Sequence, residues 1–213
     1  MKNPLLAFLT VLFFGHDASA QIVRVGIKAG GVLSTLVGPG TSIEPAISPL
    51  VGVVVGAYRT IPLGPETGSW SLQPEFLYNQ QGYRLSHAPT NYEATIRLHY
   101  VCLPVLLVFT HRRFFGAFGP QAGYLAGVRE QYSFQSPNVS GSTVRINTDR
   151  SGRSRWDAAL TAGIGYRWSK GIGVEIRYTE SLNSIYPNKG GAQSAKPRNA
   201  SIQLQASYPL LKY

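Results

Sequence analysis

The feature that most constrains the fold of this 213-residue chain is a two-residue alternation of apolar and polar side chains toward its C-terminus. Three segments show it, and their apolar positions are Trp156, Ala158, Leu160, Ala162, Ile164, Tyr166 and Trp168; Ile172, Val174, Ile176 and Tyr178; and Ile202, Leu204, Ala206 and Tyr208. Successive side chains of a β-strand point to opposite faces of its sheet. Each segment therefore predicts a strand with one apolar and one polar face.

Five upstream segments predict further strands, at about 22–36, 50–61, 69–84, 93–109 and 114–131. The stretch from Tyr100 to Phe109 is apolar on both faces, so the sequence leaves its orientation open. Pro74, Pro104 and Pro120 fall inside expected strands, where each removes a hydrogen-bond donor and predicts a bulge or local irregularity. The total is eight strands with no amphipathic helix of convincing length.

The connections between these segments alternate in length. They are short after the second, fourth and sixth segments, at 62–68, 110–113 and 169–171, and mostly longer elsewhere, at 37–49, 85–92, 132–152 and 186–198. Barrels of bacterial outer membranes combine short periplasmic turns with longer extracellular loops and an even number of strands. The pattern predicts an all-β fold, an eight-stranded antiparallel up-and-down transmembrane β-barrel. A soluble secreted barrel is the competing location.

The first twenty residues have the pattern of a secretory signal peptide. Lys2 precedes an apolar run from Leu5 to Phe14, and Ala18-Ser19-Ala20 forms a cleavage signal. The run is too short to span a membrane as a helix. We therefore expect residues 1–20 to be a cleaved signal peptide and residues 21–213 to form the barrel domain, exported to the outer membrane.

In a membrane barrel the apolar positions face lipid and the alternate positions face the lumen. Trp156 and Trp168 then fall in the two interfacial girdles of aromatic residues. The expected lumen residues are Arg24, Lys28, Gln73, Glu75, Gln121, Arg129, Asp157, Arg167, Glu175, Arg177, Gln203 and Gln205. Because buried charges need partners, we expect the three carboxylates of this set to contact its basic side chains. Such pairs would seal the narrow interior, and a narrow water or ion path is the alternative.

Motifs for catalysis are missing from the sequence. His87, His99 and His111 lack metal-ligand spacing, and there is no nucleophile elbow or phosphate-binding loop. Cys102 is the single cysteine, expected as a small buried apolar residue. The sequence thus predicts no catalytic, cofactor-binding or metal-binding residues and no cofactor; an enzyme site at the barrel rim is the less favoured alternative.

The chain carries a formal net charge of +10. Much of the excess lies in expected outer loops, at Arg145, Arg150, Arg153 and Arg155, opposed only by Asp149, and at Lys189, Lys196 and Arg198. Arginine matches phosphate geometry, so these loops could contact lipopolysaccharide phosphates in addition to membrane lipid. Solvated loops that simply tolerate arginine are the alternative. Nucleic acid is not expected as a partner, because no aromatic-interleaved basic motif is present.

Six short motifs in order resemble one family. They are Gly26-Ile27-Lys28-Ala29-Gly30, Ser71-Leu72-Gln73-Pro74-Glu75-Phe76-Leu77-Tyr78, Leu103-Pro104-Val105, Gly119-Pro120-Gln121-Ala122-Gly123-Tyr124, Gly163-Ile164-Gly165-Tyr166 and Gly173-Val174-Glu175-Ile176-Arg177-Tyr178. Across the expected mature chain this series resembles the PorT-like outer-membrane β-barrel family of Bacteroidetes. The resemblance implies an eight-stranded outer-membrane barrel. The family often has an acidic residue where this chain has Cys102. One namesake is linked to protein secretion, whereas most members have no assigned activity, which favours a structural or interaction role here over narrow transport or secretion.

Overall fold

The structure, a computed structural model, describes residues 24–38, 46–64, 69–87, 92–136, 139–147, 152–169, 171–186 and 196–212. Within these ranges the strands are β1 (Arg24–Val37), β2 (Ala46–Pro62), β3 (Trp70–His87), β4 (Tyr92–His111), β5 (Phe114–Ser136), β6 (Val139–Asn147), β7 (Trp156–Arg167), β8 (Gly173–Ser181) and β9 (Arg198–Lys212). The expected signal peptide, residues 1–20, lies outside the described residues.

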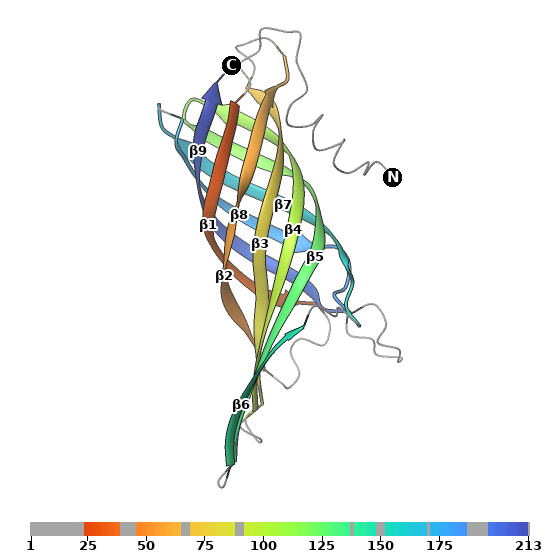
Figure 1. Ribbon diagram of the computed structural model, residues 1–213. Coiled ribbons are helices and arrows are strands. Elements are labelled where there is room, and N and C mark those ends of the chain that lie inside the picture. Colours follow the sequence, from red (N-terminus) through yellow and green to blue (C-terminus); the bar gives the residue numbers. More distant parts are fainter. Residues whose placement is uncertain are drawn as a thin grey trace, which may run out of the picture.

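Eight of these strands close into a ring (Figure 1). Their order is β4-β3-β2-β1-β9-β8-β7-β5, and the pairing of β4 with β5 completes the circle. Each neighbouring pair is antiparallel, including the first and last strands, β1 and β9. Closure gives every barrel strand two partners and leaves the ring without an edge. The predicted eight-stranded up-and-down barrel is confirmed.

The strand β6 does not belong to the ring and was not predicted. It lies in the segment expected to be the longest loop. It pairs antiparallel with the distal part of β5, from Val128 opposite Asn147 to Ser136 opposite Val139. The distal ends of β3, β4 and β5 continue past the barrel wall together with β6, so a small sheet projects from one end (Figure 1). We call this the projecting sheet, and its end of the barrel the loop end.

The side-chain faces follow the predicted alternation in most strands. Leu160, Ile164 and Ile176 are exposed on the outer surface, whereas Thr161 and Arg177 between them point inward and are buried. The ambiguous stretch of β4 also alternates. Its buried residues are Tyr100, Cys102, Pro104, Leu106 and Val108, so part of the lumen is apolar and the sequence pattern could not separate the two faces.

One predicted lumen residue, Arg129, faces outward instead. The register of β4 and β5 shifts between the pairs His99–Gly127 and Tyr100–Leu125, which leaves Ala126 as an extra residue in β5. An extra residue reverses the alternation beyond it, so Leu125 and Val128 are both buried and Arg129 is exposed. The placement of Arg129 in the lumen was therefore wrong, and the physical reason is this bulge.

The three prolines that predicted irregularities do not shift the register. Pro74 pairs opposite Val105, and the pairing of β3 with β4 resumes three residues later, at Leu77 opposite Cys102, without a shift. Pro104 behaves in the same way against β5. Pro120 lies opposite Leu160 in continuous register. The ladder has local gaps beside these prolines, which is the local irregularity that the sequence predicted, but none of the three produces a bulge.

Candidate functional site: the lumen and the loop end

Four charged side chains form the centre of the lumen. Lys28 donates to Glu75 Oε1 at 2.6 Å and to Glu175 Oε2 at 2.9 Å. Arg177 reaches the same two carboxylates, with Nη1 at 2.7 Å from Glu75 Oε2 and Nε at 2.8 Å from Glu175 Oε1. All four are buried, at 4%, 1%, 2% and 1% exposure in sequence order. Two cations thus balance two carboxylates, as expected from the sequence.

Small residues and amides complete this charged centre. A Cβ at Gly163 would lie 2.7 Å from Glu175 Oε1, so only glycine leaves room for that carboxylate. Gln73 donates to Glu75 at 2.7 Å, and Gln205 donates to Gln203 at 2.6 Å. The hydrogen bond from Gln73 holds the Glu75 carboxylate in position, as a buried ionic network requires.

An apolar cluster fills the lumen on the loop side of the charged centre. Its buried residues are Val32, Leu36, Val54, Leu77, Tyr83, Ala94, Ile96, Leu98, Tyr100, Cys102, Leu125, Val128 and Ile185. Ile185, which follows β8, is held over the barrel by backbone bonds to Ser154 at 2.8 Å and Pro197 at 3.0 Å. Cys102 is buried in this cluster, as expected. Apolar packing and paired charges together occupy the bore.

One expected ion pair, that of Asp157, is missing among the described residues. Asp157 accepts a hydrogen bond from Ser181 at 2.9 Å and forms no ion pair there. Arg167 stacks its guanidinium on Phe115, with Cζ 4.9 Å from the ring centroid, in place of a carboxylate. The prediction for Asp157 was wrong because a hydroxyl supplies its partner, whereas Glu75 and Glu175 use Lys28 and Arg177, two of the four cations expected as partners.

A polar cluster closes the loop end. Arg153 contacts Glu130 at 2.5 Å, Tyr132 donates to Glu130 at 2.6 Å, and the hydroxyls of Tyr83 and Tyr186 are 2.5 Å apart. Burial lowers the pKa of the Arg153 guanidinium, but Tyr186 and Glu130 outweigh it and the pKa is raised. Arg153 is therefore a fixed structural cation.

The expected basic loop surface is smaller than the sequence suggested. Glu130 neutralises Arg153, and Glu180 neutralises Arg198 at 2.9 Å, so Asp149 is not the only opposing charge. Arg155 and Lys196 remain exposed. Arg150 and Lys189 lie outside the described residues, as does the side chain of Arg145.

The described histidines do not converge on a reactive centre. His99 Nδ1 is 2.6 Å from the Tyr78 hydroxyl in the barrel wall, and His111 is exposed at the turn after β4. In the described ranges no three His, Cys, Asp or Glu side chains group as metal ligands would. The same ranges hold no helix that is long and apolar enough to cross a membrane.

Aromatic side chains surround both ends of the outer wall. Trp168 and Phe114 each pack edge-on against Tyr166 near the short turns, and Trp156 packs against Tyr124 near the loop end. Trp156 is 63% and Trp168 46% exposed. Two aromatic bands on an otherwise apolar wall are typical of membrane barrels.

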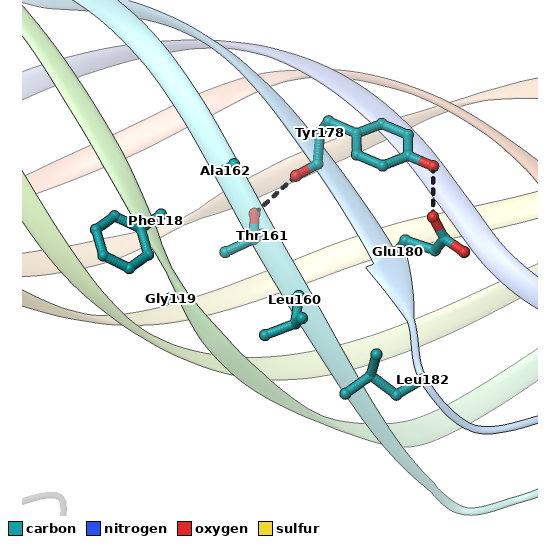
Figure 2. Close-up of a pocket in the computed structure, with 8 residues that line it drawn as sticks. All are labelled: Phe118, Gly119, Leu160, Thr161, Ala162, Tyr178, Glu180 and Leu182. Atoms are coloured by element: carbon teal, nitrogen blue, oxygen red, sulfur yellow. Dashed lines mark hydrogen bonds between the residues drawn. The ribbon is translucent and has the colours of Figure 1, made fainter.

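The outer wall also has shallow grooves (Figure 2). One of about 440 Å³ is lined by Phe118, Leu160, Ala162, Tyr178, Glu180 and Leu182. The Tyr178 hydroxyl donates to Glu180 at 2.9 Å at one end of the groove. Small residues between large ones produce such hollows, which the hydrocarbon of a bilayer fills.

The orientation of the wall can be tested without mutation. We expect a carbene reagent dissolved in the bilayer to label Leu160, Ile164 and Ile176 in the reconstituted protein, because these side chains face outward. Thr161 and Gln203 face the sealed lumen and should stay unlabelled. Peptide mapping by mass spectrometry checks both sets, and equal labelling of the two would contradict the assigned faces.

A comparison with protein families decides the family. Residues 19–186 match the model of the outer membrane protein beta-barrel domain. The chain belongs to this family. The protein is accordingly an integral β-barrel of the outer membrane.

Three solved structures are similar to this chain over most of its length. The attachment invasion locus protein Ail of Yersinia pestis has a TM-score of 0.46 and 13% identity, covering 88% of this chain and 98% of Ail. Neisserial surface protein A has a TM-score of 0.43 and 9% identity, covering 86% and 95%. The outer membrane enzyme PagL has a TM-score of 0.35 and 14% identity, covering 86% and 99%. The comparison with curated proteins finds no match.

Proposed function

We propose that this protein is a non-catalytic outer-membrane barrel that presents an interaction surface at its loop end. The observation that carries the proposal is the projecting sheet, in which β6 extends the wall beyond a filled bore. Loops and extensions on a rigid scaffold are where barrels carry function. The barrel would serve as the anchor, and the projecting sheet as the contact surface.

The filled lumen supports an interaction role over transport. A water or ion path would have to cross the network of Glu75, Glu175 and Arg177 and then the apolar cluster above it. Opening it would leave buried charges without partners, which is strongly unfavourable. Narrow transport or assistance in protein secretion is therefore the second candidate.

The edge of the projecting sheet supports a protein partner. Among the described strands, β6 pairs only with β5, so its other edge keeps free backbone donors and acceptors. Its sequence, Val139 to Asn147, has no proline and one charged residue. On the other side of the projecting sheet, β3 is covered by the start of β2, which contains Pro49. The edge of β6 lacks the prolines and clustered charges that usually block pairing, so it is suited to binding a strand from a partner protein.

The finer assignments are parts of the same proposal. The order of the six motifs supports a PorT-like barrel, and the N-terminal pattern supports cleavage of residues 1–20 before residues 21–213 fold as the barrel. The scattered histidines support the absence of catalysis. Membrane lipid surrounds the wall, and the exposed Arg155 and Lys196 would contact lipopolysaccharide phosphates from the loop end.

Crosslinking in cells tests the interaction role. Wild-type protein should co-purify with a defined partner after mild crosslinking, and a variant with residues 137–149 replaced by a short Gly-Ser turn should lose it while remaining a folded barrel. Unchanged capture by this variant would reject the projecting sheet as the contact surface. Steady conductance in planar bilayers that is lost on Arg177→Gln would favour the transport candidate instead.

A further inference from the structure

Three arginines lie on the outer face of adjacent strands near the loop end. Arg97 on β4 is directly opposite Arg129 on β5, and Arg84 on β3 is opposite Thr95, two residues from Arg97. Directly opposite side chains have Cβ atoms about 5 Å apart, and diagonal neighbours about 7–8 Å. Arg84 and Arg129 are exposed, and Arg97 is half-buried. We call these three residues the arginine row.

The arginine row carries three positive charges against one carboxylate on the described outer face of β3, β4 and β5, Glu93, which is a diagonal neighbour of Arg84. This carboxylate forms no ion pair with Arg84. Arg97 instead donates to the carbonyl of Val51 at 3.2 Å and to Gln80 at 3.5 Å. Like charges directly opposite each other destabilise a sheet. The Arg97 guanidinium accordingly reaches across β3 toward β2, away from Arg129, and a bound anion would let the two groups approach each other.

The arginine row lies just beyond the aromatic band of the loop end. Tyr78, Tyr124 and Trp156 form that band, joined across the sheet through Val101. Arg97 lies four residues beyond Val101 along β4, which is roughly 10 Å along the membrane normal at the usual strand tilt. This is the height of lipid headgroups, not of hydrocarbon.

An apolar groove lies on the same face, nearer the bilayer centre, with His99 of β4 between it and Arg97. It has a volume of about 360 Å³ and is lined by Phe76, Val101, Leu103, Ala122, Gly123, Tyr124 and Trp156. Ala122 and Gly123 form its floor because they lack bulk beside the surrounding aromatic rings. A fatty-acyl chain fits a groove of this size and polarity, and the arginine row stands where the headgroup of such a lipid would be.

The second groove of the wall gives a useful contrast (Figure 2). Its charged end holds Glu180, which pairs with Arg198 at 2.9 Å. That end is already neutral and offers no unpaired cation to a headgroup. The combination of a net cationic row with an apolar groove therefore distinguishes the β3–β4–β5 face from the face shown in Figure 2.

We propose that the arginine row and the groove below it form a site for a phosphate-bearing lipid of the outer leaflet. The Arg97 side chain turns from the Val51 carbonyl toward β5, so that its guanidinium and that of Arg129 bind the phosphate, with Arg84 beside them, and one acyl chain occupies the groove. Guanidinium pairs bind phosphate bidentately. The site rests on the proposed orientation, with the projecting sheet outside the cell, and it deepens the lipid contact proposed above by placing it on the wall.

Native mass spectrometry of the folded, detergent-solubilised protein tests this site with bis-phosphorylated lipid A as the probe. We expect the double variant Arg97→Gln/Arg129→Gln to weaken binding at least about tenfold, because two charge-assisted contacts are lost. The matched control Arg112→Gln/Arg113→Gln removes the same charge from the turn at the opposite end and should bind as the wild type does. Heat-modified migration on gels verifies that each variant is folded.

Two further experiments distinguish binding of the lipid headgroup from binding of its acyl chain. Ala122→Phe fills the groove and should weaken lipid A binding severalfold, whereas Ala206→Phe, on the outer face of β9, should not. Dephosphorylated lipid A should bind wild type and double variant equally weakly. Equal affinity of wild type and double variant for bis-phosphorylated lipid A, or full competition by inorganic phosphate alone, would overturn the proposal. Because the assay needs no protein partner, its result is independent of the crosslinking test.

Discussion

Replacing Arg177 by Met should lower the free energy of unfolding by about 3–5 kcal/mol, the usual cost of breaking a buried ionic network from one side. Arg177 is 1% exposed and contacts both Glu75 and Glu175. Without it, Lys28 alone would face two buried carboxylates, which repel each other at short range. Urea titration in phospholipid vesicles, followed by heat-modified migration, measures the loss.

Two variants define what this loss means. Arg155→Met removes an exposed arginine and should change stability by less than about 0.5 kcal/mol. Adding Glu75→Gln to Arg177→Met removes one unpaired carboxylate and should recover part of the stability. If Arg177→Met were as stable as the wild type, the four charges would not form the tightly coupled centre described here, and an open, hydrated bore would be favoured.

Substitution of Gly30 by Ala should also destabilise the barrel strongly, by about 3 kcal/mol, at the upper end of overpacking costs. A Cβ at Gly30 would lie 2.1 Å from the backbone oxygen of Leu204 and 2.8 Å from the Cα of Gln205. These are backbone atoms of the paired strand β9, which cannot move aside as a flexible side chain can. The strands β1 and β9 would have to separate locally.

The adjacent glycine supplies the control. A Cβ at Gly31 meets nothing within 4 Å. Gly31→Ala should therefore leave stability within about 0.5 kcal/mol of the wild type or raise it slightly, because alanine restricts the unfolded chain. Parallel urea titrations compare the two variants. Equal effects would show that the close approach of β1 and β9 at Gly30 does not constrain the barrel.

The sequence predicted the ring of strands because one face of each strand repeats an apolar residue every second position. Ile164 and Ile176 are exposed on the wall, and Glu75, Glu175 and Arg177 are paired in the lumen, as predicted. Whether a side chain is apolar enough to face lipid, or charged and in need of a buried partner, depends on the residue type alone. Both properties can therefore be inferred before any strand is placed beside another.

The features that the sequence did not predict depend on which residues of neighbouring strands lie opposite each other, and the sequence does not contain this register directly. Leu98, Leu106 and Leu125 point into the lumen, so an apolar residue in a strand does not by itself indicate lipid. The projecting strand β6 is specified by its partner β5, and its own short alternation was not sufficient to predict it. The arginine row was missed for a related reason, because its members lie on three strands and Arg129 was expected on the wrong face.

The bulge at Ala126 has a consequence for how barrels of this kind diversify. A single inserted or deleted codon upstream of a strand end exchanges the environments of all residues beyond it, without substituting any of them. A cation that once paired with a carboxylate in the lumen can thereby become exposed on the outer wall, and an apolar residue of the outer wall can become packed in the lumen. In such proteins a change of chain length by one residue remodels the exterior more than many point substitutions would.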